Sequence, residues 1–329
     1  MNNFSGLLDS FPGCRIAVIG DLMLDEYIWG NMERISPEAP VPILRALRRT
    51  FTLGGAGNVI ENLRSLGVEV IAIGVVGDDE TGQQVRDLLT AHGADTTGVL
   101  IDTRRPSTRK IRLMSLEHGQ QVFRLDEEST SLVTGEVEEK IISAIHAMTS
   151  GIHAIVCSDY SKGVLSERIL KSVFAAAHER GIRSIVAPKD TKAEKYKGAN
   201  ILMPNSRELL QLSAVPVASA VSLDDSARNL IEKLSLEALV VTRGREGLSL
   251  FEKSPAGLRR LDISTAARTV FDVTGAGDTA IAAFAAALAS GSDLESAAHL
   301  ANITAGIKVG KRGTASISVE EIRSALKTQ

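Results

Sequence analysis

The chain has 329 residues and a formal net charge of −3, with 44% hydrophobic, 23% charged and 4% aromatic residues. This balance is typical of a soluble globular protein and argues against an intrinsically disordered chain. With few aromatic residues and no long basic run, the sequence gives no support for a nucleic-acid surface built from phosphate contacts and stacked bases.

The cysteines favour a reducing compartment, and the first residues give no sign of export. Cys14 and Cys157 lack the spacing of a disulfide framework, and we expect both to be buried thiols in strands. The six histidines neither pair as H-x-x-x-H nor cluster, which disfavours a zinc site. The first eight residues lack a signal-peptide pattern, and the alanine-rich stretch after Thr279 is too short to span a bilayer. We therefore expect a cytoplasmic protein with no membrane partner.

The first buried strand is predicted at residues 15–20, a continuous apolar run that closes on a glycine. Asp21 follows at the carboxyl end of that strand, where open α/β sheets bind ligands, although a turn aspartate explains this residue equally well. Residues 22–52 contain three prolines and an alternating run from 41 to 47, which predicts strands that leave the main sheet.

A glycine cluster at residues 54–58 opens a predicted helix, and a strand at 70–75 and a helix at 80–92 follow. Strand-like runs return between residues 97 and 127.

In these runs Lys110 and Arg112 alternate with two aliphatic residues, which places the two cations on one face of a strand. Such a face is usually only solvated. Because residues 22–52 could pair with it, we expect segments 22–52 and 97–127 to form one discontinuous lid over a phosphate-bearing substrate.

Beyond residue 134 helices and strands alternate. Helices are predicted at 136–148 and 167–180, and strands at 154–157, 184–187, 201–203 and 239–241. Polar residues repeatedly follow a strand, at 159–163, 188–189, 205–208 and 242–247. This pattern predicts a doubly wound, mostly parallel α/β sheet flanked by helices, with its site at the carboxyl ends of the strands. We expect one domain over residues 1–329.

Residues 272–278 run into a stretch of strong helix formers, which predicts a helix from about Gly275 to Gly291. Free N–H groups at a helix start favour a bound anion, and glycines let a phosphate approach closely. Asp278 would repel that phosphate at rest, yet it could accept the proton of a hydroxyl that attacks it.

Two other interpretations of this stretch stay open. It could be a plain glycine-rich cap in which Asp278 complements the helix dipole. Residues 275–280 also satisfy the dinucleotide fingerprint G-x-G-x-x-A, but two helices follow instead of the strand that a Rossmann unit needs. The P-loop motif is missing from the sequence.

Together these motifs resemble the ribokinase-like carbohydrate kinases, also called the phosphofructokinase-B family. The resemblance covers nearly the whole chain and rests on residues 54–58, 205–208 and 272–278, in the order of the family. Within the family, residues 34–42, 110–112, 124–126 and 158–163 are similar to the kinases of heptose 7-phosphate.

The resemblance implies a role for each part of the site. The catalytic base would be Asp278, and Gly275, Ala276 and Gly277 would form the anion hole. ATP would be bound with the help of Lys189, Thr242, Gly244, Gly247 and Asn302. Magnesium would be held through water by Asn205 and Glu208, and we expect Glu208 to act through the metal rather than through the fold. Asp272 would hold a monovalent cation such as K⁺.

The resemblance also implies the sugar contacts. Sugar hydroxyls would be held by Asp21, Gly54, Gly55 and Asn58. We assign the phosphate of the substrate to Lys110, Arg112 and Arg124, because a phosphate monoester requires cations, and we place Lys162 with the substrate-binding residues.

The expected activity is ATP-dependent phosphorylation of the anomeric hydroxyl of D-glycero-D-manno-heptose 7-phosphate. The product, a 1,7-bisphosphate, would serve the synthesis of ADP-heptose and the lipopolysaccharide core. The nearest alternative is another sugar or sugar phosphate, and a catalytically silent nucleotide-binding module and a dehydrogenase are the alternatives from other classes.

Two departures from related heptose kinases are visible. Ala187 stands where they tend to have Asp, and Gln329 comes before the nucleotidyl-transferring half that bifunctional relatives carry. The chain is therefore either a stand-alone kinase or an excised domain. Because lid strands would otherwise expose edges and apolar faces, we expect a homodimer through the lid, as the resemblance also implies.

Overall fold

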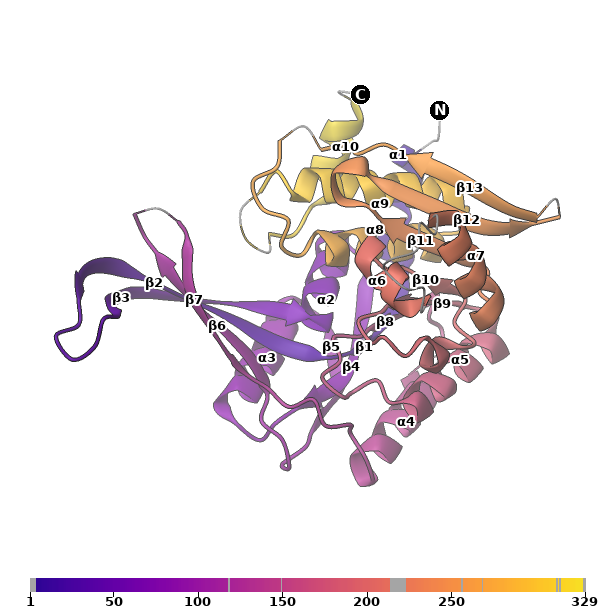
Figure 1. Cartoon of the computed structure of the whole chain (residues 1–329). Coiled ribbons are helices and arrows are strands. Elements are labelled where there is room, and N and C mark those ends of the chain that lie inside the picture. Colours follow the sequence, from indigo (N-terminus) through magenta and orange to yellow (C-terminus); the bar gives the residue numbers. More distant parts are fainter. Residues whose placement is uncertain are drawn as a thin grey trace.

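The computed structural model describes residues 4–117, 119–148, 150–213, 223–255, 257–267, 269–311, 313 and 315–327. Figure 1 shows a body in which helices surround a sheet, with long strands that project from one side.

The described residues form a main sheet whose strands are β1 Arg15–Gly20, β4 Glu69–Val76, β5 Asp95–Ile101, β8 Ala154–Ser158, β9 Arg183–Ala187, β10 Ile201–Leu202, β11 Ala238–Thr242, β12 Leu248–Ser254 and β13 Gly257–Ile263. Their order in space is β13-β12-β11-β10-β9-β8-β1-β4-β5. The strands from β11 to β5 run parallel. The hairpin of β12 and β13, which the sequence did not predict, adds an antiparallel edge.

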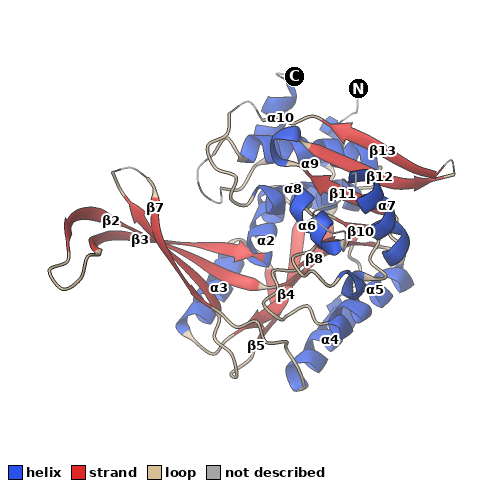
Figure 2. Cartoon of the chain, viewed as in Figure 1, coloured by secondary structure: helices blue, strands red, loops and turns tan. Residues whose placement is uncertain are grey.

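Helices cover both faces of this sheet (Figure 2). One face carries α1 Phe4–Asp9, α2 Ala56–Ser65, α3 Glu80–Ala91, α8 Ala276–Ala289, α9 Leu294–Lys308 and α10 Val319–Lys327. The other carries α4 Glu136–Met148, α5 Glu167–Arg180, α6 Ser206–Leu212 and α7 Leu223–Leu234. Short 3-10 helices lie at Phe11–Gly13, Ala193–Tyr196 and Gly244–Glu246. The predicted doubly wound α/β fold is confirmed.

Alternate strand residues supply the two core layers, as the two-residue period of a strand requires. Ile16 and Val18 of β1 pack into the layer that contains α8, whereas Ala17 and Ile19 pack into the layer that contains α5.

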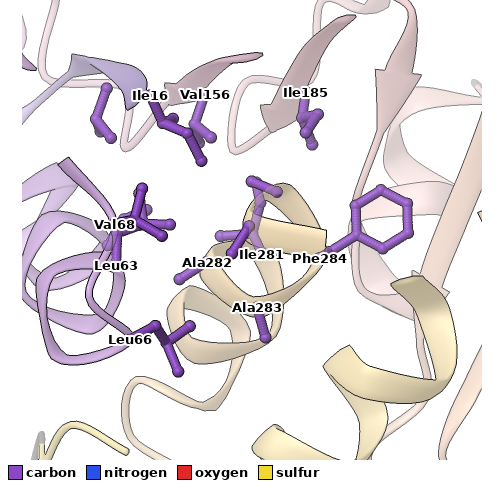
Figure 3. Close-up of a cluster of buried hydrophobic side chains, with 14 of the residues drawn as sticks. Ile16, Leu63, Leu66, Val68, Val156, Ile185, Ile281, Ala282, Ala283 and Phe284 are labelled. Atoms are coloured by element: carbon purple, nitrogen blue, oxygen red, sulfur yellow. The ribbon is translucent and has the colours of Figure 1, made fainter. Parts of the chain in front are cut away.

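Helix α8 is the most deeply buried element of the first layer. Figure 3 shows Ile281 and Phe284 with Ile16, Val156 and Ile185 of the sheet, and every residue from 278 to 288 is buried. A helix that is apolar on all sides belongs in a core. The start of α8 is therefore held by the core rather than by a surface loop.

The lid is a second sheet made of β2 Leu22–Ile35, β3 Pro42–Gly55, β6 Thr108–Ser115 and β7 Gln121–Glu127, in the order β3-β2-β6-β7. Strands β2 and β6 run parallel, and the two outer pairs are antiparallel. The second lid segment begins later than predicted. Residues 97–101 belong to β5, which pairs with β4 at the edge of the main sheet. These residues pair with β4, and Val99 is buried in the core of the main sheet, so this segment belongs to the main sheet rather than to the lid.

The lid has two chemically different faces. Lys110 lies opposite Asp126 and Arg112 opposite Arg124, so these four charged residues share a face. The other face carries aliphatic and aromatic residues from the same strands, among them Phe123, which is 58% exposed. The predicted alternation of cations and aliphatic residues is confirmed.

Both cysteines are buried and free of disulfides. Cys157 lies in β8 as expected, but Cys14 precedes β1 because a 3-10 turn ends there. No helix in the described ranges is long and apolar enough to cross a membrane.

Candidate active site

The site lies at the carboxyl ends of β1 and β8, where successive crossovers leave the sheet in opposite directions. Asp21, directly after β1, is buried and accepts hydrogen bonds from three backbone N–H groups. These come from Tyr160 at 2.7 Å, Lys162 at 3.0 Å and Val164 at 3.1 Å. Burial raises the pKa of Asp21, while these amides oppose that shift. Asp21 therefore fixes the loop that follows β8.

Asp278 lies in the first turn of α8 and has a hydrogen-bond partner on each carboxylate oxygen. Asn58 Nδ2 donates to Oδ2 at 2.7 Å, and the Tyr160 hydroxyl donates to Oδ1 at 2.8 Å. Three segments distant in the chain, namely α2, the loop after β8 and α8, thus meet at one carboxylate.

The protonation of this group suits a general base. Burial raises the pKa of Asp278 to about 6, although the hydrogen bonds from Asn58 and Tyr160 and the charge of Lys189 lower it. The pKa of Tyr160 is raised by burial and by the Asp278 carboxylate, so the phenol keeps its proton and donates it. A base with a pKa near the working pH is efficient in proton transfer.

The two glycine clusters form adjacent walls of the site. Gly55 and Gly275 are the N-cap residues of α2 and α8, with φ of 55° and 77°. A Cβ on Gly275 would lie 2.8 Å from Asn58 Nδ2, so a side chain there would displace the amide that holds Asp278. No atom would meet a Cβ on Gly277 within 4 Å, among the described residues, so the backbone of Gly277 is open to an approaching ligand.

A cavity of about 260 Å³ opens over this turn. Its lining includes Tyr160, Lys189, Asn205, Glu208, Gly277 and Asp278. Ala187 also lines it. The cavity therefore brings together the predicted base, the anion-hole glycines and the predicted metal-binding pair.

Glu208 also has a role in the fold. Asn205 Oδ1 accepts a hydrogen bond from Glu208 N at 2.9 Å, and Glu208 Oε2 accepts one from Asn205 N at 2.8 Å, which forms a capping box at the start of α6. Lys189 Nζ donates to the other carboxylate oxygen of Glu208. The expectation that Glu208 acts through a metal rather than through the fold is therefore incomplete.

The donor set nevertheless suits magnesium. No group of three or more His, Cys, Asp or Glu side chains that could hold a metal occurs in the described part of the chain. Magnesium commonly keeps several waters and uses one or two carboxylates together with substrate phosphates. Asn205 and Glu208 at the edge of the cavity fit that mode.

A second cavity, of about 490 Å³, adjoins the first, since Thr242, Val273 and Gly277 line both. The predicted nucleotide residues Gly244, Gly247 and Asn302 line it together with mostly apolar side chains. Asn302 Nδ2 donates to Ser264 O at 2.8 Å, which fixes the amide. An apolar pocket with a few polar groups suits a heterocyclic base.

Arg112 is the most enclosed of the predicted phosphate-binding arginines. Its side chain is 13% exposed, its Nη1 lies 2.8 Å from Asp25 Oδ1, and its guanidinium lies 5.2 Å from the centre of the Tyr27 ring. Within the described residues, Nη1 and Oδ1 are both buried, and their contact lacks good hydrogen-bond geometry. Arg112 and Asp25 thus form an enclosed ion pair.

The other predicted cations lie beside Arg112. Lys110 Nζ lies 3.3 Å from Asp126 and 3.2 Å from Glu128, and Lys162 Nζ donates to Glu128 at 2.7 Å. Arg124 forms an ion pair with Asp126. We call Lys110, Arg112, Arg124 and Lys162, with Asp25, Asp126 and Glu128, the lid cluster. Because Asp25 raises the pKa of both Asp278 and Tyr160, this cluster lies near the base.

Asp272 lies behind the anion hole. Its Oδ1 accepts a hydrogen bond from Thr274 N at 2.9 Å and its Oδ2 accepts one from Gly313 N at 3.0 Å. Asp272 thus joins the loop before α8 to the segment after α9.

Tyr160 and Asp25 were not predicted as site residues. Its position just after the strand predicted at 154–157 marked Tyr160 as a possible site residue. Local spacing does not reveal that its partner is Asp278, 118 positions away. Asp25 lay in a segment interpreted only as lid strand.

Comparison with known proteins identifies relatives. The model of the pfkB family carbohydrate kinases matches residues 15–322. The bifunctional protein HldE of Pelobacter propionicus is 44% identical over 309 residues, which are 94% of this chain and 62% of that protein. The HldE of Geobacter sulfurreducens is 43% identical over 324 residues, which are 98% of this chain and 65% of that protein. The chain thus spans less than two thirds of the length of these relatives.

Solved structures agree on the fold. The ribokinase of Arabidopsis thaliana, complexed with ribose and ATP, superposes with a TM-score of 0.72 at 20% identity, over 95% of this chain and 99% of that one. Phosphofructokinase-2 from Escherichia coli, in complex with potassium, superposes with a TM-score of 0.77 at 19% identity, over 96% of this chain and 98% of that one.

Proposed function

The chain belongs to the pfkB family of carbohydrate kinases, and we propose that it transfers a phosphoryl group from ATP to the anomeric hydroxyl of D-glycero-D-manno-heptose 7-phosphate. The observation that carries the proposal is Asp278, a buried base held by Asn58 and Tyr160 beside an open helix start.

The reaction needs one proton acceptor and one site for developing charge. Asp278 takes the proton of the anomeric hydroxyl. The hydroxyl oxygen of the sugar forms a bond to the γ-phosphorus of ATP, while the bond between that phosphorus and the leaving ADP oxygen breaks. The Gly277 N–H at the start of α8 stabilises the charge on the transferring group, whereas the Ala276 N–H already donates to Val273 O at 3.2 Å.

The two adjacent cavities suit ATP. We place the adenine near Asn302 in the larger one and the phosphates near Lys189 in the smaller one. Asn205 and Glu208 would hold magnesium through water, and the ion would neutralise charge on the nucleotide phosphates.

The lid cluster supports a phosphorylated sugar as the acceptor. Four cations face three carboxylates there, which leaves one positive charge in excess. Asp21, by contrast, already accepts three backbone hydrogen bonds. We therefore assign it to the positioning of the Tyr160 loop rather than to direct binding of a sugar hydroxyl. Asn58 likewise positions Asp278, and we keep Gly54 and Gly55 as the sugar-facing wall.

A kinase screen tests the substrate. ATP, magnesium and a panel of sugar phosphates that includes heptose 7-phosphate would be compared with the same sugars lacking the phosphate. We expect the highest kcat/KM for heptose 7-phosphate and a 1,7-bisphosphate product in the ³¹P spectrum. Preference for an unphosphorylated sugar would refute the substrate, and preference for another sugar phosphate would support the nearest alternative.

We also propose a homodimer that forms through the lid. The apolar lid face includes Ile111, Leu113, Phe123 and Leu125, and the last two are 58% and 49% exposed. Contiguous exposed apolar surface of this kind marks interaction sites. Sedimentation of Phe123→Glu should show monomer where the wild type is dimeric, whereas Leu210→Glu, on α6, should not change the mass. A monomeric wild type at micromolar concentration would contradict the proposal.

A further inference from the structure

A buried lysine lies directly behind the anion hole. Lys308, the last residue of α9, is 1% exposed, and its Nζ donates a hydrogen bond to Gly313 O at 2.7 Å. A Cβ built on Gly275 would lie 3.8 Å from Lys308 Cε, so the end of this side chain lies against the loop that opens α8.

The surroundings of Lys308 are those of a cation site. It lies at the C-terminus of a helix, where the dipole favours positive charge. Burial lowers the pKa of Lys308, and the carboxylates of Asp272 and Asp278 oppose that shift and favour the charged form. Lys308 in turn helps to lower the pKa of Asp272, although burial of that carboxyl acts the other way.

Asp272 is the residue at which a monovalent cation was expected, and the structure does not fit that expectation. Each of its oxygens accepts a backbone N–H, and Gly313, whose N–H binds Asp272, accepts from Lys308 through its carbonyl. A second positive ion at Asp272 would lie close to a buried ammonium, and both repulsion and desolvation oppose that.

We propose that the ammonium of Lys308 takes the place of a monovalent cation behind the anion hole, so that the enzyme carries this charge within its own chain and needs no K⁺. The ammonium is a positioning group: it holds Gly313, which in turn donates to Asp272, and it adds positive charge beneath the loop that receives the transferring phosphoryl group. In a buried site such a charge acts with little screening by solvent.

This inference rests on the proposed phosphoryl transfer but not on the identity of the sugar. The first measurement is therefore the binding of a non-hydrolysable ATP analogue by calorimetry. Buffers would contain magnesium and either K⁺ or tetramethylammonium at equal ionic strength. We expect the wild-type Kd to be the same in both. Clear tightening by K⁺ alone would overturn the proposal, even if no sugar phosphate were turned over.

Two variants sharpen the experiment. Lys308→Ala removes the charge and leaves space, so affinity and kcat should fall about tenfold or more without K⁺ and recover when K⁺ or ammonium is added. Lys308→Met removes the charge but fills the space, so the same salts should restore little. Equal behaviour of both variants in all salts would refute the replacement.

Lys171→Ala is the control, because Lys171 lies on α5, is 71% exposed and pairs with Glu167. It should behave as the wild type in both buffers. Melting temperatures of all variants separate misfolding from the loss of the cation, and the wild-type comparison stands even if Lys308→Ala is unstable.

Discussion

The catalytic corner around Asp278 and the lid cluster around Arg112 are built in opposite ways. Asp278, Asn58 and Tyr160 are joined by hydrogen bonds of 2.7 and 2.8 Å between elements of the main body. In the lid cluster every cation contacts a carboxylate, and the exposed fraction of its side chain varies from 13% for Lys110 and Arg112 to 49% for Arg124. The corner is organised before substrate arrives, whereas the cluster holds charges that a substrate can take over.

The difference separates chemistry from recognition. Preorganised groups at a reacting centre avoid reorganisation during the reaction. The Arg124–Asp126 pair is partly exposed and contributes little to stability, so a phosphate dianion can take over this cation at small cost. On the proposed function, the body would serve the phosphoryl transfer and the lid would bind the acceptor.

The largest expected effect is at Asp278. Asp278→Asn keeps the shape of the corner but removes the proton acceptor, so kcat should fall by roughly two to four powers of ten. Nucleotide affinity should stay the same or rise slightly, since a negative charge near the phosphates is lost. Kinetics and calorimetry on one preparation would measure both, and a near-normal kcat would exclude Asp278 as the base.

The same variant tests the protonation of the corner. Because the pKa of Asp278 is raised from 3.8 to about 6, the folded state holds the proton more tightly than the unfolded chain, and stability falls as pH rises through this range. Asp278→Asn should therefore be more stable than wild type at pH 7 by on the order of 1–3 kcal/mol. The difference should vanish below roughly pH 4, and equal urea midpoints at pH 7 would contradict this.

The next effect concerns the lid. Arg112→Met should raise the KM for the sugar phosphate and leave that for ATP nearly unchanged. Loss of a charge-assisted hydrogen bond costs roughly 1.5–3 kcal/mol, or about ten- to hundredfold. Arg124→Met is the matched comparison and should have the smaller effect, because its side chain is 49% exposed. An unaltered KM in Arg112→Met would remove this residue from phosphate binding.

Tyr160→Phe links the two regions and should have a moderate effect. Since the hydrogen bond from Tyr160 lowers the pKa of Asp278, its removal should shift the acidic limb of the kcat/KM profile to higher pH and slow the reaction a few-fold at neutral pH. Tyr196→Phe is the control: Tyr196 donates to Asp159 at 2.6 Å, and its loss should lower stability without moving the limb. An unshifted limb in Tyr160→Phe would show that the phenol does not tune the base.

The smallest effect is expected from Glu208→Gln. Glutamine can complete the capping box of α6, so the melting temperature should stay close to wild type while the magnesium needed for half-maximal rate rises. Glu208→Ala should lose the cap as well, at about 0.3–1.5 kcal/mol of stability. Identical magnesium titrations for Glu208→Gln and wild type would reject the metal role.

The sequence predicted what depends on local pattern. The strand before Asp21, the helix that starts at Gly275 and the alternation of Lys110 and Arg112 all follow from short periodicities. The apolar run of β5 fits a lid strand and a body strand equally well, so its sheet was assigned wrongly.

Contacts between distant segments could not be predicted in this way. The approach of Tyr160 to Asp278 and of Asp25 to Arg112 depends on how separate elements pack, which a single sequence does not reveal. The sequence did not single out Lys308, because its enclosure behind Gly275 depends on the fold.

The assembly of the catalytic corner has a consequence for folding. Its hydrogen bonds join residues 220 and 118 positions apart, and the bond that ties the Tyr160 loop to Asp21 spans 139. Contacts of such separation form slowly, and at 5–20 residues per second residue 278 follows residue 58 on the ribosome by roughly 10–45 s. A nascent or partly refolded chain therefore lacks an oriented base and cannot consume ATP. Kinase activity during refolding should return with the slowest structural phase, well after the helices have formed.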